Sequence, residues 1–173
     1  MAGFDTGWLS RIEDASLNAS APPQQLWLDG WLVRLCPGKA KRARSINAVA
    51  AGRRGVADKL ADARRLFAEA GLPLVVRLTP FSQPADLDDQ LAGLGLQRFD
   101  DTCVMVAPAA ALRLQDELPA GAEMQAVDSA TFAEAVGGLR GTPPAQRQAH
   151  LQRLLQSPVP YQGWLVTRQG ELL

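Results

Sequence analysis

The sequence predicts an α/β fold whose strands form a mixed sheet. Three observations lead to this prediction: an Asp-Gly pair between two short apolar runs, a helical repeat of apolar residues over 56–70, and short apolar runs before and after that helix. The Asp-Gly pair favours an antiparallel hairpin. Two strands joined through a helix favour a parallel pair, so the sheet should contain both kinds of connection.

The first elements expected are a helix and a hairpin. A short amphipathic helix over 8–18 precedes two strands, 25–28 and 31–36. Asp29 and Gly30 separate the strands and suit a type I′ turn, because both residues tolerate positive φ. A Pro-Gly pair ends the second strand, and a basic loop follows.

A strand–helix–strand unit is expected next. The first strand covers 45–50, and the helix begins at Val56 and ends at Gly71, which suits a C-terminal cap. The segment 74–78 is short and largely apolar, so it is expected to be an internal strand.

Another helix and a long strand should complete this part of the chain. Pro84 is placed to open a helix over 85–92, and the run 96–107 reads as a strand. The bulky residues of that strand are expected to face inward: Phe99, Val104 and Val106.

A second pattern begins at the strand 123–127. Asp128 and Ser129 are candidates for the N-cap of a helix over about 131–136. Thr142 is expected to cap a further helix with Pro143 near its first position. One face of that helix carries three leucines: Leu151, Leu154 and Leu155.

The chain should close on a hairpin. Residues 161–167 read as a strand, and a Gln-Gly turn leads into a returning strand at 171–173. We therefore expect one module over 1–108, a linker over 109–121 and the N-terminal part of a second module over 122–173. The chain reads as one that ends within its second module, with an open strand edge through which two copies could pair.

Composition favours a globular protein of the cytoplasm. Of the 173 residues, 47% are hydrophobic and 21% are charged, which suffices for a buried core. No apolar run approaches the roughly 20 residues that a membrane helix needs. The two cysteines, Cys36 and Cys103, are expected to be buried free thiols, and a single histidine makes a metal site improbable.

The net charge of zero conceals a basic region. Between Arg34 and Arg65 only Asp58 and Asp62 are acidic, and ten residues are basic. Such an excess attracts anions, so its ligand is a phosphorylated cofactor, a nucleotide or nucleic acid, or else the region is a solvated loop without a ligand. The ten are Arg34, Lys39, Lys41, Arg42, Arg44, Arg53, Arg54, Lys59, Arg64 and Arg65.

The end of this region has the pattern of a phosphate cradle. A strand over 45–50 runs into a glycine-containing bend, and a helix starts at Val56. Backbone N–H groups at such a bend and the positive end of the helix dipole can hold a phosphate group.

The run from Trp31 to Val106 resembles the acetyl-CoA-dependent N-acetyltransferase superfamily, GNAT. Its order of hairpin, strand, bend, helix, strand and helix is that of the family, and GRRGVA stands at the family's cofactor loop. DGWLVR followed by GKAKRARSIN resembles the first half of two-module bacterial members. The resemblance implies that acetyl-CoA is the cofactor and that the loop binds its pyrophosphate. The residues implied are Arg53, Arg54, Gly55, Val56 and Ala57.

The residues that would carry catalysis in this family are replaced in the first module. The resemblance puts Leu91 at the position of the tyrosine that protonates the leaving thiolate, and Pro84 at the position of an asparagine. Gly52 stands where the family usually has Gln or Arg. No acidic residue lies between Asp29 and Asp58 to act as a base. We therefore assign no catalytic residue and expect this chain to be inactive.

The second module would bind the acceptor, a small-molecule or peptide amine. Arg140, His150 and Tyr161 are the candidate substrate-binding residues, with Trp164 as a further possibility. His150 and Trp164 could equally be packing residues of the core. The alternative function is a non-catalytic module that binds CoA, a nucleotide or a partner through the basic loop 39–54. Nucleic acid is disfavoured, because no aromatics interleave with the basic residues.

Overall fold

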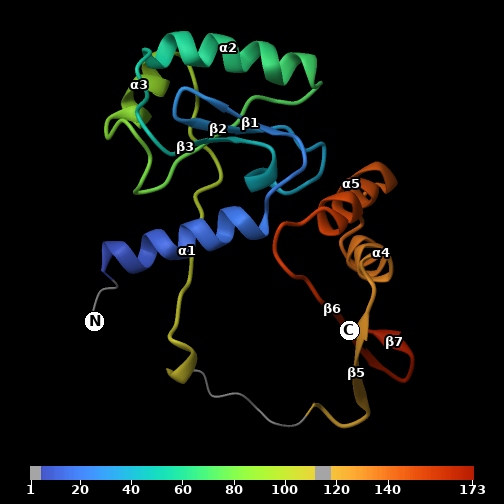
Figure 1. Ribbon diagram of the computed structural model, residues 1–173. Coiled ribbons are helices and arrows are strands. Elements are labelled where there is room, and N and C mark those ends of the chain that lie inside the picture. Colours follow the sequence, from blue (N-terminus) through green and yellow to red (C-terminus); the bar gives the residue numbers. More distant parts are fainter. Residues whose placement is uncertain (1–4, 112–117) are drawn as a thin grey trace.

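The computed structural model describes residues 5–111 and 118–173, which we call the N-terminal half and the C-terminal half (Figure 1). The N-terminal half holds a four-stranded sheet in the order β1-β2-β3-β4, and the C-terminal half holds a three-stranded sheet in the order β5-β6-β7. The first sheet is mixed and the second is antiparallel. The predicted α/β fold with a mixed sheet is thus confirmed.

The first sheet is built on the predicted hairpin. β1 (Gln25–Leu28) and β2 (Trp31–Arg34) pair antiparallel, and the turn residues Asp29 and Gly30 have φ of 43° and 86°. These positive values are those of a type I′ turn, which a residue with a larger side chain would adopt only under strain. β2 also pairs antiparallel with β3 (Ile46–Ala48).

A helical crossover completes the sheet. α2 (Val56–Glu69) starts at the predicted residue, and Gly71 follows its C-terminus with φ of 64°. The chain then returns as β4 (Val76–Arg77), which pairs parallel with β3. β4 has only two residues and lies at the edge of the sheet, so the prediction of an internal strand over 74–78 is wrong.

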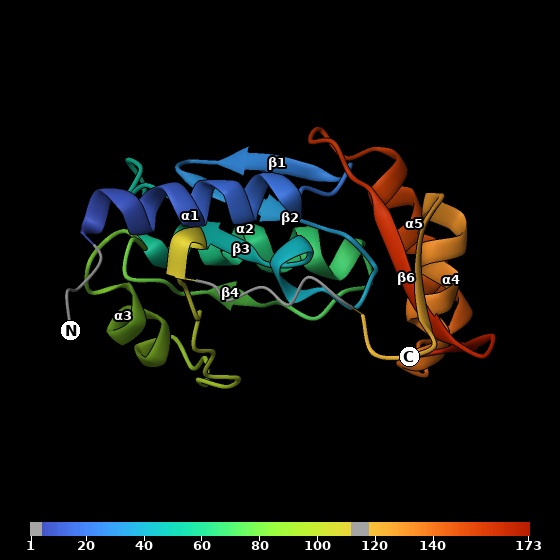
Figure 2. The ribbon, with the colours of Figure 1, turned by 90° about the horizontal axis from the view of Figure 1, so that it is seen from below.

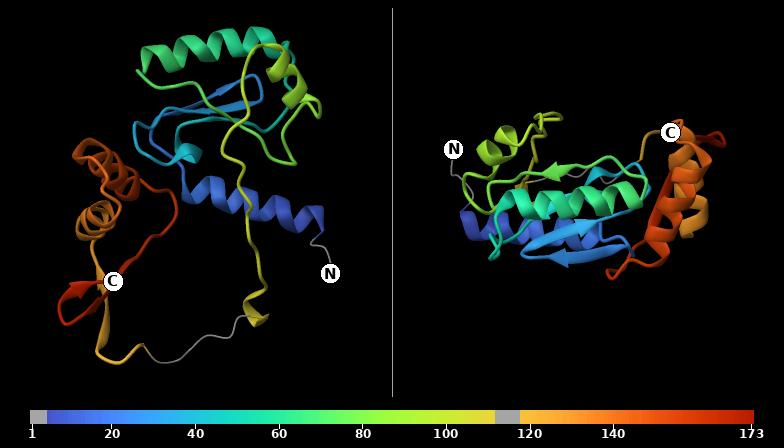
Figure 3. Two further views of the ribbon diagram at one scale, coloured as in Figure 1. Left: turned by 180° about the vertical axis from the view of Figure 1, so that it is seen from behind. Right: turned by 90° about the horizontal axis from the view of Figure 1, so that it is seen from above.

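Two helices cover opposite faces of the first sheet, α2 on one side and α1 (Thr6–Ala19) on the other (Figures 1 and 3). Successive side chains of a strand point to opposite faces of the sheet. In β2 and β3 every second residue packs against α2, so the apolar core lies between the sheet and this helix. The buried residues of the core come from β2, β3, α2 and α3 (Leu87–Gly93): Trp31, Val33, Ile46, Ala48, Val56, Leu60, Ala63, Phe67, Leu87 and Leu91.

The face toward α1 carries the buried polar residues Arg34 and Asn47 beside Leu32. Arg34 is buried and donates to the carbonyl oxygen of Leu17 at 3.0 Å, near the C-terminus of α1. A cation at this end of a helix satisfies its last carbonyl groups. Burial, with smaller contributions from Arg42 and Arg77, lowers the pKa of Arg34 to about 10. An ion pair between Glu13 and Arg77 also joins α1 to the sheet.

α3 (Leu87–Gly93) begins later than the sequence predicts. Pro84 does not open it, since the helix starts three residues further along and Asp86 is its N-cap. Leu87 and Leu91 face the core as expected. Gly95, with φ of 82°, follows the end of the helix.

The strand predicted over 96–107 is absent. Phe99 and Val104 are 57% and 58% exposed, so their prediction as inward-facing residues is wrong. The edge strand β4 has only two residues, which is too few for a long ladder, and Asp100 adopts a positive φ of 61° that interrupts an extended chain. The segment leads to a 3₁₀ turn at Ala109–Ala111, and another such turn, Lys41–Ala43, precedes β3.

The C-terminal half packs two helices beside its own sheet (Figure 2). β5 (Ala122–Val127) pairs with β6 (Gly163–Arg168), and β6 pairs with β7 (Glu171–Leu172). Between β5 and β6 the chain forms α4 (Ser129–Leu139) and α5 (Pro144–Leu155). The expected strand, helix, helix and hairpin are therefore all present.

Details of this half differ from the sequence predictions. Asp128 is the N-cap of α4 as expected and accepts from the N–H of Thr131 at 2.7 Å. The N-cap of α5 is Pro143 instead of Thr142. Leu155 is 62% exposed, so only part of the leucine face is buried, and Trp164 is 51% exposed instead of packed.

Both cysteines are free thiols, but only Cys36 is buried; Cys103 is exposed, because the strand expected around it does not form. Within the described residues, no helix is long and apolar enough to cross a membrane.

Candidate anion-binding site

The loop predicted to cradle phosphate is filled by a carboxylate of the same chain. The backbone N–H of Arg53 donates to both carboxylate oxygens of Asp29, at 3.0 and 2.8 Å, and the N–H of Arg54 donates to one of them at 2.7 Å. These hydrogen bonds, that of Arg54 first, lower the pKa of Asp29. The donors that a pyrophosphate would need are therefore occupied by Asp29.

Two further residues build this contact. Gly52 has φ of 75°, and a Cβ there would lie 2.0 Å from the carbonyl oxygen of Asp29. The close approach explains why glycine stands at this position. The buried Lys59 donates to the same carbonyl oxygen at 3.2 Å and to that of Ala51, with its ammonium 4.7 Å from the ring centroid of Trp31.

The predicted cofactor residues lie around this loop in different settings. The side chain of Arg53 is 97% exposed, and its Nε lies 3.8 Å from a carboxylate oxygen of Asp29. Arg54 pairs with Asp62 at 2.7 Å. Gly55 is the N-cap of α2, Val56 belongs to the core, and Ala57 is exposed on the first turn of α2.

Many of the basic residues between Arg34 and Arg65 are buried or form ion pairs within the fold. Arg34 and Lys59 are buried, Lys41 pairs with Asp100, and Arg54 and Arg65 share Asp62. Such pairing reduces the charge that the region offers to an external anion.

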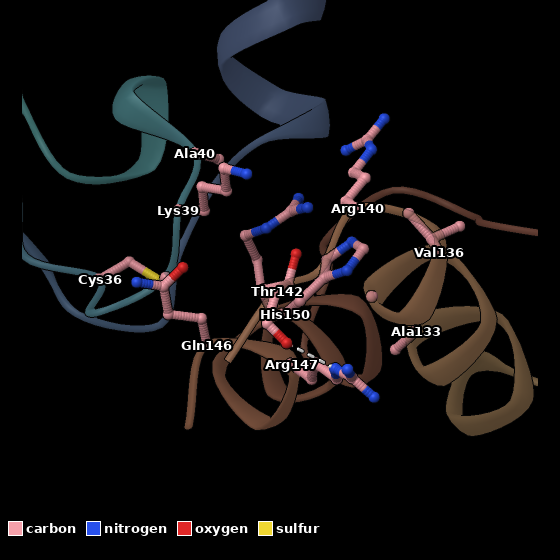
Figure 4. Close-up of a pocket in the computed structure, with 13 residues that line it drawn as sticks. Cys36, Lys39, Ala40, Ala133, Val136, Arg140, Thr142, Gln146, Arg147 and His150 are labelled. Atoms are coloured by element: carbon pink, nitrogen blue, oxygen red, sulfur yellow. Dashed lines mark hydrogen bonds between the residues drawn. The ribbon is translucent and has the colours of Figure 1, made fainter. Parts of the chain in front are cut away.

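A second place gathers basic side chains: a pocket of about 100 Å³ between the two halves, which we call the basic pocket (Figure 4). The loop after β2 forms one wall and α4, α5 and the turn between them form the other. No Asp or Glu is among its lining residues, which are Cys36, Gly38, Lys39, Ala40, Ala133, Val136, Gly137, Arg140, Thr142, Gln146, Arg147, His150 and Arg153.

The cations reach the basic pocket from separate elements. Lys39 comes from the loop after β2, Arg140 is the residue that ends α4, and His150 and Arg153 lie on α5. Figure 4 shows the side chains of Lys39, Arg140 and His150 around a shared space. Neither Lys39 nor Arg140 forms a side-chain hydrogen bond or ion pair with another described residue.

The other two arginines of the basic pocket form hydrogen bonds within the fold: Arg147 with the turn between α4 and α5, and Arg153 with the end of α1. Arg147 donates from its Nε to the carbonyl oxygen of Thr142 at 2.7 Å and pairs with Glu134, so its charge is already partnered. Arg153 donates to the carbonyl oxygen of Ala19 at 3.3 Å and thereby connects α5 to the end of α1.

His150 is half-buried in the wall. Burial, followed by the charges of Arg153 and Arg140, lowers the pKa of His150 below its usual value. Its ring lies edge-on to Phe132 with centroids 6.5 Å apart, and Phe132 contacts Tyr161 in the same manner at 5.4 Å. Of the predicted substrate-binding residues, Arg140 and His150 line the basic pocket. Tyr161 does not line it and contacts Phe132, which in turn contacts His150.

Sequence reasoning missed Lys39, Arg147 and Arg153 as members of one site. A signal was present in α5, because Arg147, His150 and Arg153 recur every three residues and so share a helix face. The position of Lys39 opposite that face depends on how the halves pack, which no local pattern reveals.

Among residues 5–111 and 118–173, no cluster of three or more His, Cys, Asp or Glu side chains could hold a metal ion. Comparisons with protein families, with curated proteins and with solved structures find no match.

Proposed function

We propose that this chain is a non-catalytic binding protein of N-acetyltransferase-like design, and that it holds an anionic group in the basic pocket. One observation carries the proposal: Lys39, Arg140, His150 and Arg153 line one small cavity to which no carboxylate contributes. Gathered positive groups repel each other, and an anion among them relieves that repulsion while accepting several charge-assisted hydrogen bonds.

The state of these side chains supports binding over a structural role. Arg147 and Arg153 have partners within the fold, but the charges of Lys39 and Arg140 have none among the described residues. Because Lys39 and Arg140 approach from different halves, an anion between them would bridge the two halves.

Acetyl transfer is the less supported candidate. The order of hairpin, strand, bend, helix and parallel strand favours a relation to N-acetyltransferases. However, the N–H groups of Arg53 and Arg54 donate to Asp29 where the resemblance requires pyrophosphate of acetyl-CoA. Leu91, at the position of the catalytic acid, is a buried core residue.

The proposal is tested by calorimetric titration with inorganic phosphate at low ionic strength. The wild-type protein should bind, and Lys39→Ala should bind more weakly, because it removes one cation of the pocket. Arg11→Ala is the matched control: Arg11 is exposed on α1 and does not line the pocket, so the variant should bind as the wild type does. Absence of phosphate binding by the wild type would refute the proposal.

An acetylation assay tests the non-catalytic part separately. With acetyl-CoA and a panel of small amines and peptides, the chain should release no free thiol above the rate without protein. Sustained transfer to any acceptor would show that the chain is an enzyme.

A further inference from the structure

The size and charge of the basic pocket limit the ligand that it can hold. Its volume of about 100 Å³ is well below the roughly 300–1,000 Å³ of pockets that enclose drug-sized molecules. One compact group fits, while the remainder of a larger ligand would stay outside. Lys39, Arg140 and Arg153 carry fixed positive charge around that space, which favours a group with more than one negative charge.

His150 is the one group in the wall whose charge changes near neutral pH. The charged groups that face it are Lys39 from the N-terminal half, Arg140 at the end of α4, and Arg147 and Arg153 on α5. Glu134 on α4 is engaged with Arg147. Burial and the charges of Arg153 and Arg140 favour the neutral imidazole when no anion is bound.

A divalent anion in the pocket reverses this balance. Its negative charge offsets the field of the surrounding cations, and the imidazolium gains a partner that accepts its hydrogen bond. Binding and protonation then support each other, so the site takes up a proton when it fills.

We propose that the basic pocket is selective for a divalent oxyanion of the phosphate monoester class, and that His150 gains a proton from solvent as the anion binds. This inference rests on the proposed function of the pocket. The terminal phosphate of a phosphorylated small molecule has the required size and charge. The proton comes from water or buffer, and no covalent bond of the ligand changes.

Sulfate is the suitable probe, because it keeps two charges across the range from about pH 6 to 8 and does not itself titrate. Calorimetric titrations in buffers of different ionisation enthalpy give the number of protons taken up. We expect uptake of a fraction of one proton, and an affinity that rises as the pH falls, by at most about tenfold per pH unit for a single group. Glycerol phosphate should bind at least as well as sulfate, and acetate more weakly than either.

His150→Gln keeps a polar side chain of similar length but cannot titrate. It should retain sulfate binding at about pH 8 and lose both the proton uptake and the pH dependence. Proton counting on the wild type gives the same answer without any variant, so a folding defect in His150→Gln does not decide the outcome.

The outcomes separate the inference from the proposed function. Sulfate binding without proton uptake, or with a pH dependence unchanged in His150→Gln, would overturn the role of His150 and leave the pocket as an anion site. Acetate binding as tightly as sulfate would overturn the selectivity. If neither sulfate nor phosphate binds, the proposed function falls together with this inference.

Discussion

Asp29 connects the turn of the first hairpin to the loop that begins α2. Its carboxylate accepts from the N–H groups of Arg53 and Arg54, and its carbonyl oxygen accepts from Lys59. The side chain thus takes the place that a bound phosphate would have at such a bend. These hydrogen bonds within the chain fix the conformation of the loop before α2 without a ligand.

Replacing Asp29 by Asn should reduce stability at neutral pH and change its acid dependence. The pKa of Asp29 is lowered in the folded protein, so its stabilising effect is present above the ordinary aspartate pKa of about 4 and is lost as the pH falls through the lower folded value. Thermal melts of the wild type and Asp29→Asn should therefore differ at about pH 7, and the difference should shrink as the pH falls below about 4. Curves that stay parallel over this range would contradict the role given to this carboxylate.

Lys59 is a charged residue inside the core, held by two carbonyl oxygens and the ring of Trp31. Lys59→Ala should destabilise the fold by about 2–4 kcal/mol, because it removes the donor to both carbonyl oxygens and leaves a cavity where the buried side chain was. Arg65→Ala, on the exposed side of the same helix, is the control and should change the stability by no more than about 0.5 kcal/mol. Equal effects in chemical denaturation would be inconsistent with a buried, partnered Lys59.

Local backbone conformations could be predicted from the sequence, but long-range contacts between side chains could not. The turn at Asp29 and the cap at Gly71 follow from local φ requirements, and both were predicted. The contact of Asp29 with the loop at 53–54 was not, because it joins residues 24 and 25 positions apart. For the same reason, Lys59 counted as part of a solvent-facing basic region although it is buried.

At the scale of elements, helices followed their patterns and one long strand did not. α1, α2, α4 and α5 form close to where periodicity and capping placed them, since a helix satisfies its own backbone hydrogen bonds. A strand needs a neighbour, and the run 96–107 has apolar residues but no long strand beside it. Sequence alone does not supply that neighbour.

Two adjacent glycines of α4 give a matched test of the packing between α4 and α5. A Cβ on Gly138 would meet nothing within 4 Å, so Gly138→Ala should stabilise the protein by up to about 1 kcal/mol through helix propensity. A Cβ on Gly137 would lie 2.6 Å from Cγ of Arg147, so Gly137→Ala should destabilise it by about 1–3 kcal/mol. Urea denaturation of both variants measures the difference. A gain in stability for Gly137→Ala would mean that the helices are packed less closely than described.

At the scale of the whole molecule, the basic pocket depends on how the two halves meet. The loop at 36–40 and the pair α4–α5 are about a hundred residues apart in the chain, yet both line the cavity. The sequence identified Arg140 and His150 as candidates, and α5 carried a readable basic face. Their meeting with Lys39 is a property of the assembled fold.

An anion that binds the folded pocket should stabilise the whole chain. At a concentration about 100 times its Kd, phosphate should add about 2.7 kcal/mol to the free energy of unfolding, if it does not bind the unfolded chain. Melting temperatures measured against phosphate concentration at constant ionic strength should rise with saturation. A flat response at constant ionic strength would leave only general salt effects.

The most direct test of the central claim is the affinity for inorganic phosphate in two arginine variants. Arg140→Ala removes an unpartnered cation from the wall of the basic pocket, whereas Arg168→Ala removes an exposed arginine of β6 that does not line it. By isothermal titration at one salt concentration, Arg140→Ala should weaken binding about tenfold or more, and Arg168→Ala should match the wild type. Equal affinities in the two variants, or equal losses, would contradict an anion site between the two halves.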